Sequence, residues 1–362
     1  MRAANTAQVA RLTRADFRDR ATAALANAPR SFASLDVHTS GEPTRILLDA
    51  IAGGPWKSAA EAGEEIQANH DWLRRAATFE PRGHRGMFGA ALVPIDRPDC
   101  SWGVVFLSPD GYPAMCGHAT IGVVTALVEL RLVETRGRTA SITLDTPAGP
   151  ILTRVETDRD GAGAVTFRNR PAFVLERRAV RTPGGDPVDA KIAWGGQWYA
   201  FVEAEPFGLS IDLTQVHHLV AAAAEVRLQL AADGAQSDPR TGEPVQVGNI
   251  VWVAPGEAGA RARNVAISPA GAFDRSPCGT GTSARLAVLH AEGALGHGEV
   301  FVNEGILGTR FEARIVEEVE VAGCPGVVPE VTGQAWLAGF SEFWIDPTDP
   351  LGDGFLPGEG HA

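Results

Sequence analysis

The chain has 362 residues, enough for two domains that each bury a hydrophobic core. Hydrophobic residues make up 44% of it and charged residues 21%, the composition of an ordinary water-soluble protein. The net charge of −12 argues against the basic surface that nucleic-acid binding needs. The sequence contains no run of about 18 apolar residues, so no membrane span is predicted.

Residues 1–31 precede the first strand signal and are predicted to form an N-terminal extension. Val9, Leu12, Phe17 and Ala21 follow helical spacing, so we expect a helix in this segment. The segment lacks the continuous apolar stretch of a secretory signal. Without a sign of secretion, the four cysteines of the chain are expected to be free thiols in a reducing cytoplasm.

The elements expected in the first half of the chain alternate between strands and helices. A polar-faced helix is predicted at 58–77 and an apolar helix at 119–133. Strands are predicted at 32–37, 46–50, 102–107, 140–145, 150–156 and 164–168. The strongest candidate for a linker is Thr-Pro-Gly-Gly-Asp-Pro at 182–187.

The pattern restarts after this linker. Helices are predicted at 213–232 and 281–292, and strands at 191–194, 198–202, 245–253 and 262–268. The Gly195-Gly196 pair between two of these strands indicates a bend rather than a ligand-binding loop.

Two cysteines lie in near-matching frames, Met-Cys-Gly-His at 115–118 and Pro-Cys-Gly-Thr-Gly-Thr at 277–282, each just before a predicted helix. Aligning the two frames also matches three further pairs of identical residues: Gly117 with Gly279, Thr120 with Thr282, and Leu127 with Leu289. The frames are about 160 residues apart, roughly the length of one domain. We therefore expect an internal duplication of a strand, a loop, a cysteine and a helix.

A thiol at a helix N-terminus is made acidic, because the free amides and the helix dipole favour the thiolate. If the two helix starts face each other, their free amides form two cradles for an anion such as an amino-acid carboxylate: those of Gly117, His118, Gly279 and Thr280. Binding there acidifies the Cα–H and places donors where negative charge develops. One thiolate then removes the proton and the opposite thiol delivers another, which inverts Cα without a cofactor.

Simpler interpretations exist for the cysteines and histidines. A cysteine is often just a small buried hydrophobic residue, and Cys100 and Cys324, which lack duplicated surroundings, are interpreted as incidental. The chain contains no Cys-x-x-Cys motif, so neither a zinc ribbon nor a thioredoxin-type site is predicted. His217 and His218 are neighbours, so on a helix they point apart and predict no metal site.

Two cofactor sites are disfavoured by their surroundings. Cys-Gly-Thr-Gly-Thr-Ser-Ala at 278–284 is similar to a dinucleotide-binding loop, but Arg-Ser-Pro at 275–277 before it is not a strand. Pyridoxal phosphate needs a Schiff-base lysine. Lys57 lies in a polar segment, and Lys191 begins a strand with no phosphate-binding loop beside it. We therefore expect no cofactor and no metal.

At these residues the chain resembles the proline racemase family. The resemblance extends from about Phe32 to Leu356 and is carried by MCGH at 115–118, DRSPCGTGTSA at 274–284, HTSGEPTR at 38–45 and EPRGH at 80–84. It implies an α/β (α+β) fold like that of diaminopimelate epimerase. In that fold, two pseudo-symmetric domains each wrap a sheet around a central helix, and the active site lies in the cleft between them. It also implies a homodimer that uses no cofactor.

The resemblance also implies a division of the chain and a set of site residues. The first domain is expected at 32–182 plus 341–362 with Cys116, and the second at 183–340 with Cys278. These two cysteines correspond to the catalytic pair of the family. The carboxylate-binding amides correspond to Gly117, His118, Gly279 and Thr280, and the residues at the ring nitrogen to His118 and Asp274.

Three positions bear on the substrate that the resemblance implies. Members that dehydrate trans-3-hydroxy-L-proline commonly carry threonine where this chain keeps Cys278, which favours a two-thiol racemase or epimerase. Phe88 resembles the aromatic wall of the proline racemases, at a position where the hydroxyproline epimerases tend to carry a smaller residue. Ser268 stands where those enzymes carry phenylalanine; as in hydroxyproline epimerases, the smaller residue opens room, and it offers a hydroxyl to a substrate OH.

The sequence thus favours inversion at Cα of a proline-type amino acid, by a 4-hydroxyproline 2-epimerase or a proline racemase. Its expected partner is this small molecule, and neither nucleic acid nor a membrane. Two alternatives stay open. One is a dehydratase of trans-3-hydroxy-L-proline, in which Cys278 helps the hydroxyl to leave, and the other is a binding protein that has kept the fold without the activity.

Overall fold

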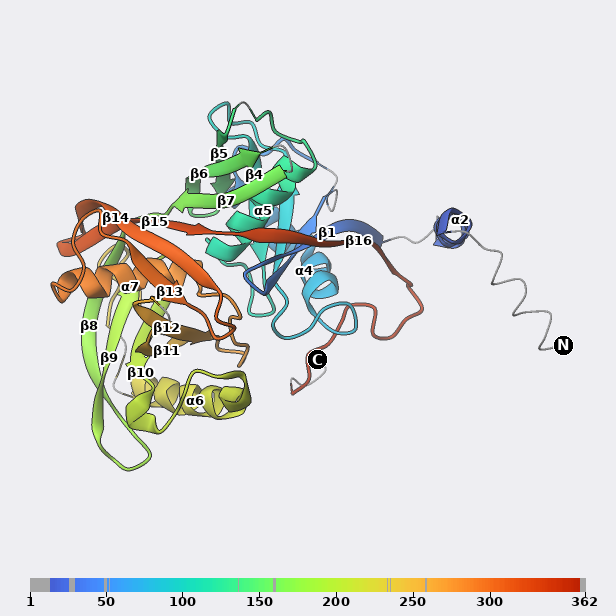
Figure 1. Ribbon diagram of the computed structural model, residues 1–362. Helices are drawn as coiled ribbons and strands as arrows, with labels where there is room; N and C mark the ends of the chain where they lie inside the picture. The colour runs from blue at the N-terminus through green and yellow to red at the C-terminus, as the bar shows by residue number, and fades with distance from the viewer. Residues whose placement is uncertain are drawn as a thin grey trace.

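Two apolar helices, each starting directly after a cysteine, occupy the centres of two lobes (Figure 1). The computed structural model describes residues 14–25, 30–48, 51, 53–135, 137–158, 161–232, 234, 236–257 and 259–358. The central helices are α5, Gly117–Glu129, and α7, Gly279–Ala291. Nearly all of their residues are buried, as expected for a helix that a sheet surrounds.

The first lobe wraps its strands around α5 in the order β7-β6-β5-β4-β3-β2-β1-β16. Two further helices, α3 and α4, cover the outer face of this sheet and bury a second apolar layer against it. The bounds are β1 Arg30–Thr39, β2 Glu42–Leu47, α3 Ala59–Asn69, α4 Asp71–Thr78, β3 Gly89–Val93, β4 Trp102–Leu107, β5 Thr139–Thr146, β6 Gly149–Asp158, β7 Gly161–Arg168 and β16 Ala335–Ile345.

The second lobe wraps its strands around α7 in the order β14-β13-β12-β11-β10-β9-β8-β15, and a pairing of β14 with β15 closes the ring. The helix α6 packs on the outside, where Trp252 donates a hydrogen bond to the carbonyl of Leu219. The bounds are β8 Ala172–Arg181, β9 Pro187–Trp194, β10 Trp198–Glu203, α6 Val216–Ala232, β11 Asn249–Pro255, β12 Ala262–Ile267, β13 Phe301–Glu304, β14 Arg310–Val321 and β15 Cys324–Gly333.

A single extended ribbon, β15 followed by β16, joins the two lobes and runs along both in Figure 1. β15 pairs with β14 and β8 in the second lobe, and its last residues pair with β7 of the first. After Gln334 the chain continues as β16, which pairs with β1. The ribbon therefore holds the lobes side by side, so that the N-termini of α5 and α7 point into the space between them.

The helix predicted at 58–77 is two helices in the structure. His70 interrupts it with a non-helical φ of −136°, and Asp71 starts α4. The carboxylate of Asp71 then accepts hydrogen bonds from Arg74 within the first turn, which stabilises the new helix start. The helices predicted at 119 and 281 begin two residues earlier, at Gly117 and Gly279, because each cysteine is itself the N-cap.

The predicted linker at 182–187 is instead the turn of a hairpin that joins β8 to β9. The N–H of Gly185 donates to the carbonyl of Thr182 at 2.9 Å, and the positive φ of Gly185, 91°, allows the reversal. Both strands of this hairpin pack against α7. The division into two domains stays a proposal, and the hairpin places β8, which begins at Ala172, in the second lobe.

The helix expected in the N-terminal extension is confirmed for Arg14–Leu25, which is α2, whereas Val9 and Leu12 lie outside the described residues. None of the helices in the described part of the chain combines the length and the hydropathy that crossing a bilayer needs.

Candidate active site

The N-termini of α5 and α7 meet at two glycines. A Cβ on Gly117 would lie 2.7 Å from the Cα of Gly279, and a Cβ on Gly279 would lie 2.7 Å from the Cα of Gly117. Since side-chain carbons do not approach this closely, only glycine at both positions lets the two helix starts share one space. The N-terminal ends of both helices, where unpaired N–H groups favour an anion, are thereby brought together.

Cys116 caps α5 and has an imidazole as its neighbour. Its backbone is extended, and its Sγ lies 3.2 Å from Nδ1 of His118 in the first turn of the helix. Both side chains are buried. Burial lowers the pKa of His118, so its imidazole is neutral near neutral pH and interacts with Cys116 as a dipole rather than as a cation.

Cys278 caps α7 in a strained conformation. Its φ of 65° lies in the left-handed region, which is uncommon for a residue with a side chain. The hydroxyl of Ser276 accepts a hydrogen bond from the N–H of Cys278 at 3.1 Å and holds this turn. The Sγ lies 3.7 Å from Oη of Tyr199, and a Cβ on Gly281 would come within 2.8 Å of it.

The thiols are less acidic than the sequence pattern predicted. Burial raises the pKa of Cys116 well above its ordinary value and also raises that of Cys278, and the nearby carboxylate of Asp274 acts in the same direction. The N–H groups of Ala119 and Gly281 lower these pKa values, as expected at a helix N-terminus. Because the loss of hydration outweighs these donors, the raised pKa values contradict the expectation of acidic thiols.

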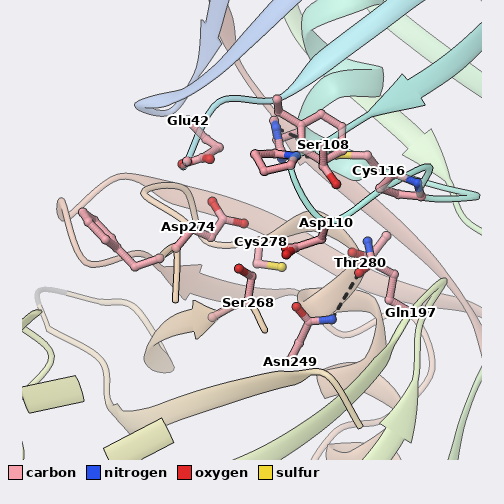
Figure 2. Close-up of a pocket in the computed structure, with 18 of the residues that line it drawn as sticks. Glu42, Ser108, Asp110, Cys116, Gln197, Asn249, Ser268, Asp274, Cys278 and Thr280 are labelled. Atoms are coloured by element: carbon pink, nitrogen blue, oxygen red, sulfur yellow. Dashed lines mark hydrogen bonds between the residues drawn. The ribbon is translucent and has the colours of Figure 1, made fainter. Parts of the chain in front are cut away.

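A cavity of about 340 Å³ lies between the helix starts. Figure 2 shows Cys116 and Cys278 on opposite sides of it. All of the site residues predicted from the sequence line this cavity: Phe88, Cys116, Gly117, His118, Ser268, Asp274, Cys278, Gly279 and Thr280. Their roles stay predictions. Within the described chain, no group of three or more His, Cys, Asp or Glu side chains is arranged to bind a metal ion.

The walls of the cavity differ in chemistry. On one side the ring of Phe88 meets the imidazole of His118 edge to face, with 4.8 Å between the ring centroids. On another side the buried hydroxyl oxygen of Ser268 has no hydrogen-bond partner among the described residues. The carboxylate of Asp274 accepts hydrogen bonds from the N–H and the hydroxyl of Ser276, both at 2.8 Å, which orients it beside Cys278.

The cavity also contains polar residues that were not singled out from the sequence: Glu42, Asp110, Gln197, Tyr199 and Asn249. Glu42 lies inside the HTSGEPTR motif and Tyr199 inside a predicted strand, so both could have been proposed. Asn249 donates to Gln197 at 3.1 Å (Figure 2), and this pair forms only when β10 and β11 lie side by side. No local pattern marks such a residue.

Comparison with known proteins identifies close sequence relatives. The model of a family described as proline racemase matches residues 34–356. The 4-hydroxyproline 2-epimerase of Streptosporangium roseum is 40% identical over 333 residues, and the proline racemase of Clostridioides difficile is 39% identical over 330 residues. The trans-3-hydroxy-L-proline dehydratase of Azospirillum brasilense is 36% identical over 329 residues. Each alignment covers 90% of this chain and 98% of the relative.

A solved structure shows the same fold. The crystal structure of a hydroxyproline epimerase from Agrobacterium vitis, with trans-4-hydroxy-L-proline bound, superposes on this chain with a TM-score of 0.82. The two sequences are 28% identical, and the superposition covers 91% of this chain and 96% of the other. The fold of two sheets wrapped around two central helices, expected from the sequence, is confirmed.

Proposed function

This chain belongs to the proline racemase family, and from that membership and its cavity we propose that it inverts Cα of a proline-type amino acid with Cys116 and Cys278 as the two bases. It is therefore an enzyme of this family. The observation that carries the proposal is the placement of two thiols on opposite sides of one cavity, each at the N-terminus of a central helix.

The proposed substrate places its carboxylate between the helix starts. The backbone N–H groups of Gly117, His118, Gly279 and Thr280 belong to the first turns of the two helices and have no partners within them. They and the helix dipoles favour an anion there. Withdrawal of charge from the carboxylate acidifies the Cα–H and stabilises the negative charge that develops when this proton leaves.

In the proposed chemistry, the thiolate of one cysteine takes the proton from Cα and the thiol of the other delivers a proton to the opposite face. The S–H bond that forms on one side replaces the one that breaks on the other, so no cofactor is required. The reverse reaction uses the same two groups with their roles exchanged. His118 and Asp274 are proposed to contact the ring nitrogen from the same cavity.

The walls of the cavity support a hydroxyproline more than proline. Phe88 offers an apolar surface to the ring, whereas the hydroxyl of Ser268 is buried without a partner. An unpaired buried hydroxyl is costly, and a substrate OH would satisfy it. We therefore propose 4-hydroxyproline as the preferred substrate and proline as a poorer one.

Dehydration of trans-3-hydroxy-L-proline is the second candidate function. One cysteine would remove the Cα–H, and the other would donate its proton to the leaving 3-hydroxyl, so that water departs and an enamine forms. The dehydratase relative favours this alternative. The resemblance implies that dehydratases commonly carry threonine at position 278. This chain has Cys278 there, and the retained thiol favours inversion.

Incubation in D₂O with L-proline, trans-4-hydroxy-L-proline and trans-3-hydroxy-L-proline, each separately, tests both functions. Proton NMR follows the Cα signal and polarimetry follows the configuration. We expect Cα exchange with inversion, fastest for the 4-hydroxy compound, and tight binding of pyrrole-2-carboxylate, whose flat ring carbon mimics the transition state. Loss of only the 3-hydroxy compound, with a new imine or enamine absorbance, would identify a dehydratase.

A homodimer is the assembly that we propose. Trp336, Leu337 and Phe340 on β16 expose large apolar surfaces, and Phe340 is 66% exposed. β16 also lies at one end of the strand order, with β1 as its neighbour. Apolar side chains grouped on an edge strand suit contact with a second chain. Light scattering of the protein and of a Phe340→Glu variant tests this, and a monomeric wild-type protein would contradict it.

A further inference from the structure

Tyr199 connects the thiol of Cys278 to the side chain of Thr280. The tyrosine lies on β10 and is buried. Its Oη is 2.5 Å from Oγ1 of Thr280 and 3.7 Å from Sγ of Cys278. The phenol is thus placed between one of the two proposed bases and a hydroxyl in the first turn of α7.

We propose that Tyr199 is a positioning residue for Cys278, and that its hydroxyl exchanges hydrogen-bond partners when this thiol gains or loses its proton. This inference rests on the two-thiol function proposed above. When Cys278 is a thiolate, the O–H of Tyr199 donates to Sγ and the O–H of Thr280 donates to Oη. When Cys278 is a thiol, its S–H donates to Oη and the O–H of Tyr199 donates to Thr280. No proton is transferred between Cys278, Tyr199 and Thr280 in this exchange, because only the directions of their O–H and S–H bonds change.

Such a partner suits a base that must also act as an acid. Cys278 has to accept a proton in one direction of the reaction and donate one in the other, so both of its states need a satisfied environment inside a buried site. A phenol offers one donor and one acceptor, and it can serve either state without moving its ring. A methyl or phenyl group in its place would leave the thiolate without this donor.

The duplicated frames support the assignment independently. Position 118 in the first frame aligns with position 280 in the second, and the residues there are His118 and Thr280. The imidazole of His118 reaches Sγ of Cys116 directly, at 3.2 Å. The hydroxyl of Thr280 instead bonds to Tyr199, which contacts Sγ of Cys278. In the second half, Tyr199 and Thr280 together therefore provide the contact with the thiol that His118 alone provides in the first half.

The electrostatic surroundings fit a phenol that keeps its proton. Burial raises the pKa of Tyr199 well above its ordinary value, and the nearby Cys278 thiolate adds to this effect. Asp274 raises the pKa of both Cys278 and Tyr199, and Cys278 in turn raises the pKa of Cys116 across the cavity. The hydroxyl of Tyr199 and the N–H of Gly281 both lower the pKa of Cys278 and so favour its thiolate. Tyr199 is therefore a side-chain donor that offsets part of the repulsion from Asp274.

The test measures the pKa of each thiol without turnover. The rate of alkylation by iodoacetamide is followed against pH, and mass spectrometry reports the peptides of Cys116 and Cys278 separately. Tyr199→Phe should raise the apparent pKa of Cys278 by about one pH unit, since it removes a hydrogen bond to a charged group, and should leave Cys116 unchanged. Tyr112→Phe is the matched control, because its hydroxyl donates to Asp71 of α4 instead.

A second measurement uses the unmutated chain. Tyr112 and Tyr199 are its two tyrosines, so incorporation of 3-fluorotyrosine gives two fluorine signals, which Tyr112→Phe assigns. The Tyr199 signal should shift with the same apparent pKa as the alkylation of Cys278, and this shift should vanish in Cys278→Ser. The proposal would be overturned by a Tyr199 fluorine signal that does not shift as Cys278 titrates. An equal change of the pKa values of both thiols in Tyr199→Phe would also overturn it.

These outcomes are separate from the fate of the proposed function. If the thiol pKa values respond as expected but no substrate is inverted, the function is wrong and the role of Tyr199 stands. If the wild-type protein inverts its substrate while Tyr199→Phe leaves the pKa of Cys278 in place, the function stands and the role of Tyr199 is wrong. Where both hold, the rise of kcat/KM with pH should move to higher pH in Tyr199→Phe by the same amount.

Discussion

Glu42 and Arg275 join the two lobes at the rim of the cavity. The carboxylate of Glu42 accepts a hydrogen bond from the backbone N–H of Arg275 at 2.7 Å and another from its Nη1 at 3.2 Å. Glu42 begins β2 of the first lobe, whereas Arg275 lies in the segment of the second lobe that leads into Cys278. This pair therefore holds the segment that carries Asp274 and Cys278 against the first lobe.

The charge of Glu42 should make stability depend on pH. Burial, followed by the neighbouring Asp274, raises the pKa of Glu42 well above its ordinary value of 4.5, although Arg275 opposes this. The folded state thus holds this proton more tightly than the unfolded state. The resulting stabilisation is complete below the ordinary pKa and is lost as the pH rises through the folded pKa. Glu42→Gln, which keeps an acceptor for Arg275, lacks this dependence.

Urea unfolding of both proteins between about pH 5 and about pH 8 measures this effect. We expect the free energy of unfolding of the wild-type protein to fall relative to that of Glu42→Gln as the pH increases. Glu225→Gln, at an exposed position on α6, is the matched control. A difference between Glu42→Gln and the wild-type protein that stays constant over this range would show that Glu42 has the same pKa in both states.

Replacement of either proposed base should stop inversion. In Cys116→Ser and in Cys278→Ser, we expect the rate of inversion at Cα to fall by about 1000-fold or more, because a serine hydroxyl neither ionises nor returns a proton as a thiol does. Cys324→Ser, on β15 and outside the residues that line the cavity, should retain full activity. Polarimetry with 4-hydroxyproline measures all three variants. Inversion that survives in either cavity variant would refute the two-base mechanism.

The dependence of activity on pH should follow the thiols. The reaction needs one thiolate, and burial raises the pKa of both Cys116 and Cys278 above their ordinary value of 9.0. We therefore expect kcat/KM, which reports the free enzyme, to be still rising at about pH 9. Burial keeps His118 neutral by lowering its pKa, so His118 should add no step between neutral pH and this rise. A profile that is already flat at neutral pH would contradict this.

The positions of the central helices and of the cavity residues could be predicted from the sequence because their signals are local. The apolar runs after Cys116 and Cys278 indicate helices, and the matched residues of the two frames, such as Gly117 with Gly279, indicate an internal duplication. The structure places Gly117 and Gly279 against each other, as two facing helix starts require. The motif residues around them line the cavity for the same reason, since each lies within a few residues of a helix start.

The remaining features depend on tertiary contacts that no local pattern records. The bond from Tyr199 to Thr280 requires β10 to lie beneath the start of α7, and the pair Glu42–Arg275 requires two lobes to close on each other. The pKa of a thiol depends on how much water the fold removes, so the acidic thiols expected from the helix N-termini become weakly acidic ones. Likewise, Thr-Pro-Gly-Gly-Asp-Pro suits a hairpin turn as well as a linker.

The hydroxyl of Ser268 should determine the choice between hydroxyproline and proline. It is buried and has no partner among the described residues, so a substrate hydroxyl gains a hydrogen bond there. Such a bond contributes about 1 to 1.5 kcal/mol, so Ser268→Ala should reduce kcat/KM for trans-4-hydroxy-L-proline by about tenfold. The value for L-proline should stay unchanged and serves as the internal control. Equal losses for both substrates would mean that Ser268 does not contact the substrate hydroxyl.

The contact between the two helix starts should be intolerant of any side chain. In Gly279→Ala, the new Cβ would lie 2.7 Å from the Cα of Gly117, so the two helices must separate. We expect a loss of about 1 to 3 kcal/mol in the free energy of unfolding, as for other overpacked sites. Binding of pyrrole-2-carboxylate should weaken by at least about tenfold, or about 1.4 kcal/mol, because one carboxylate can no longer reach both sets of N–H groups.

Gly339→Ala on β16 is the matched control for this variant, because a Cβ there meets no atom within 4 Å. It should change the free energy of unfolding by less than about 0.5 kcal/mol and leave ligand binding intact. Calorimetry with pyrrole-2-carboxylate measures binding, and urea unfolding measures stability. If Gly279→Ala lost stability but bound the ligand as tightly as the wild-type protein, the carboxylate would have to bind at one helix start alone, and the proposed cradle between α5 and α7 would be wrong.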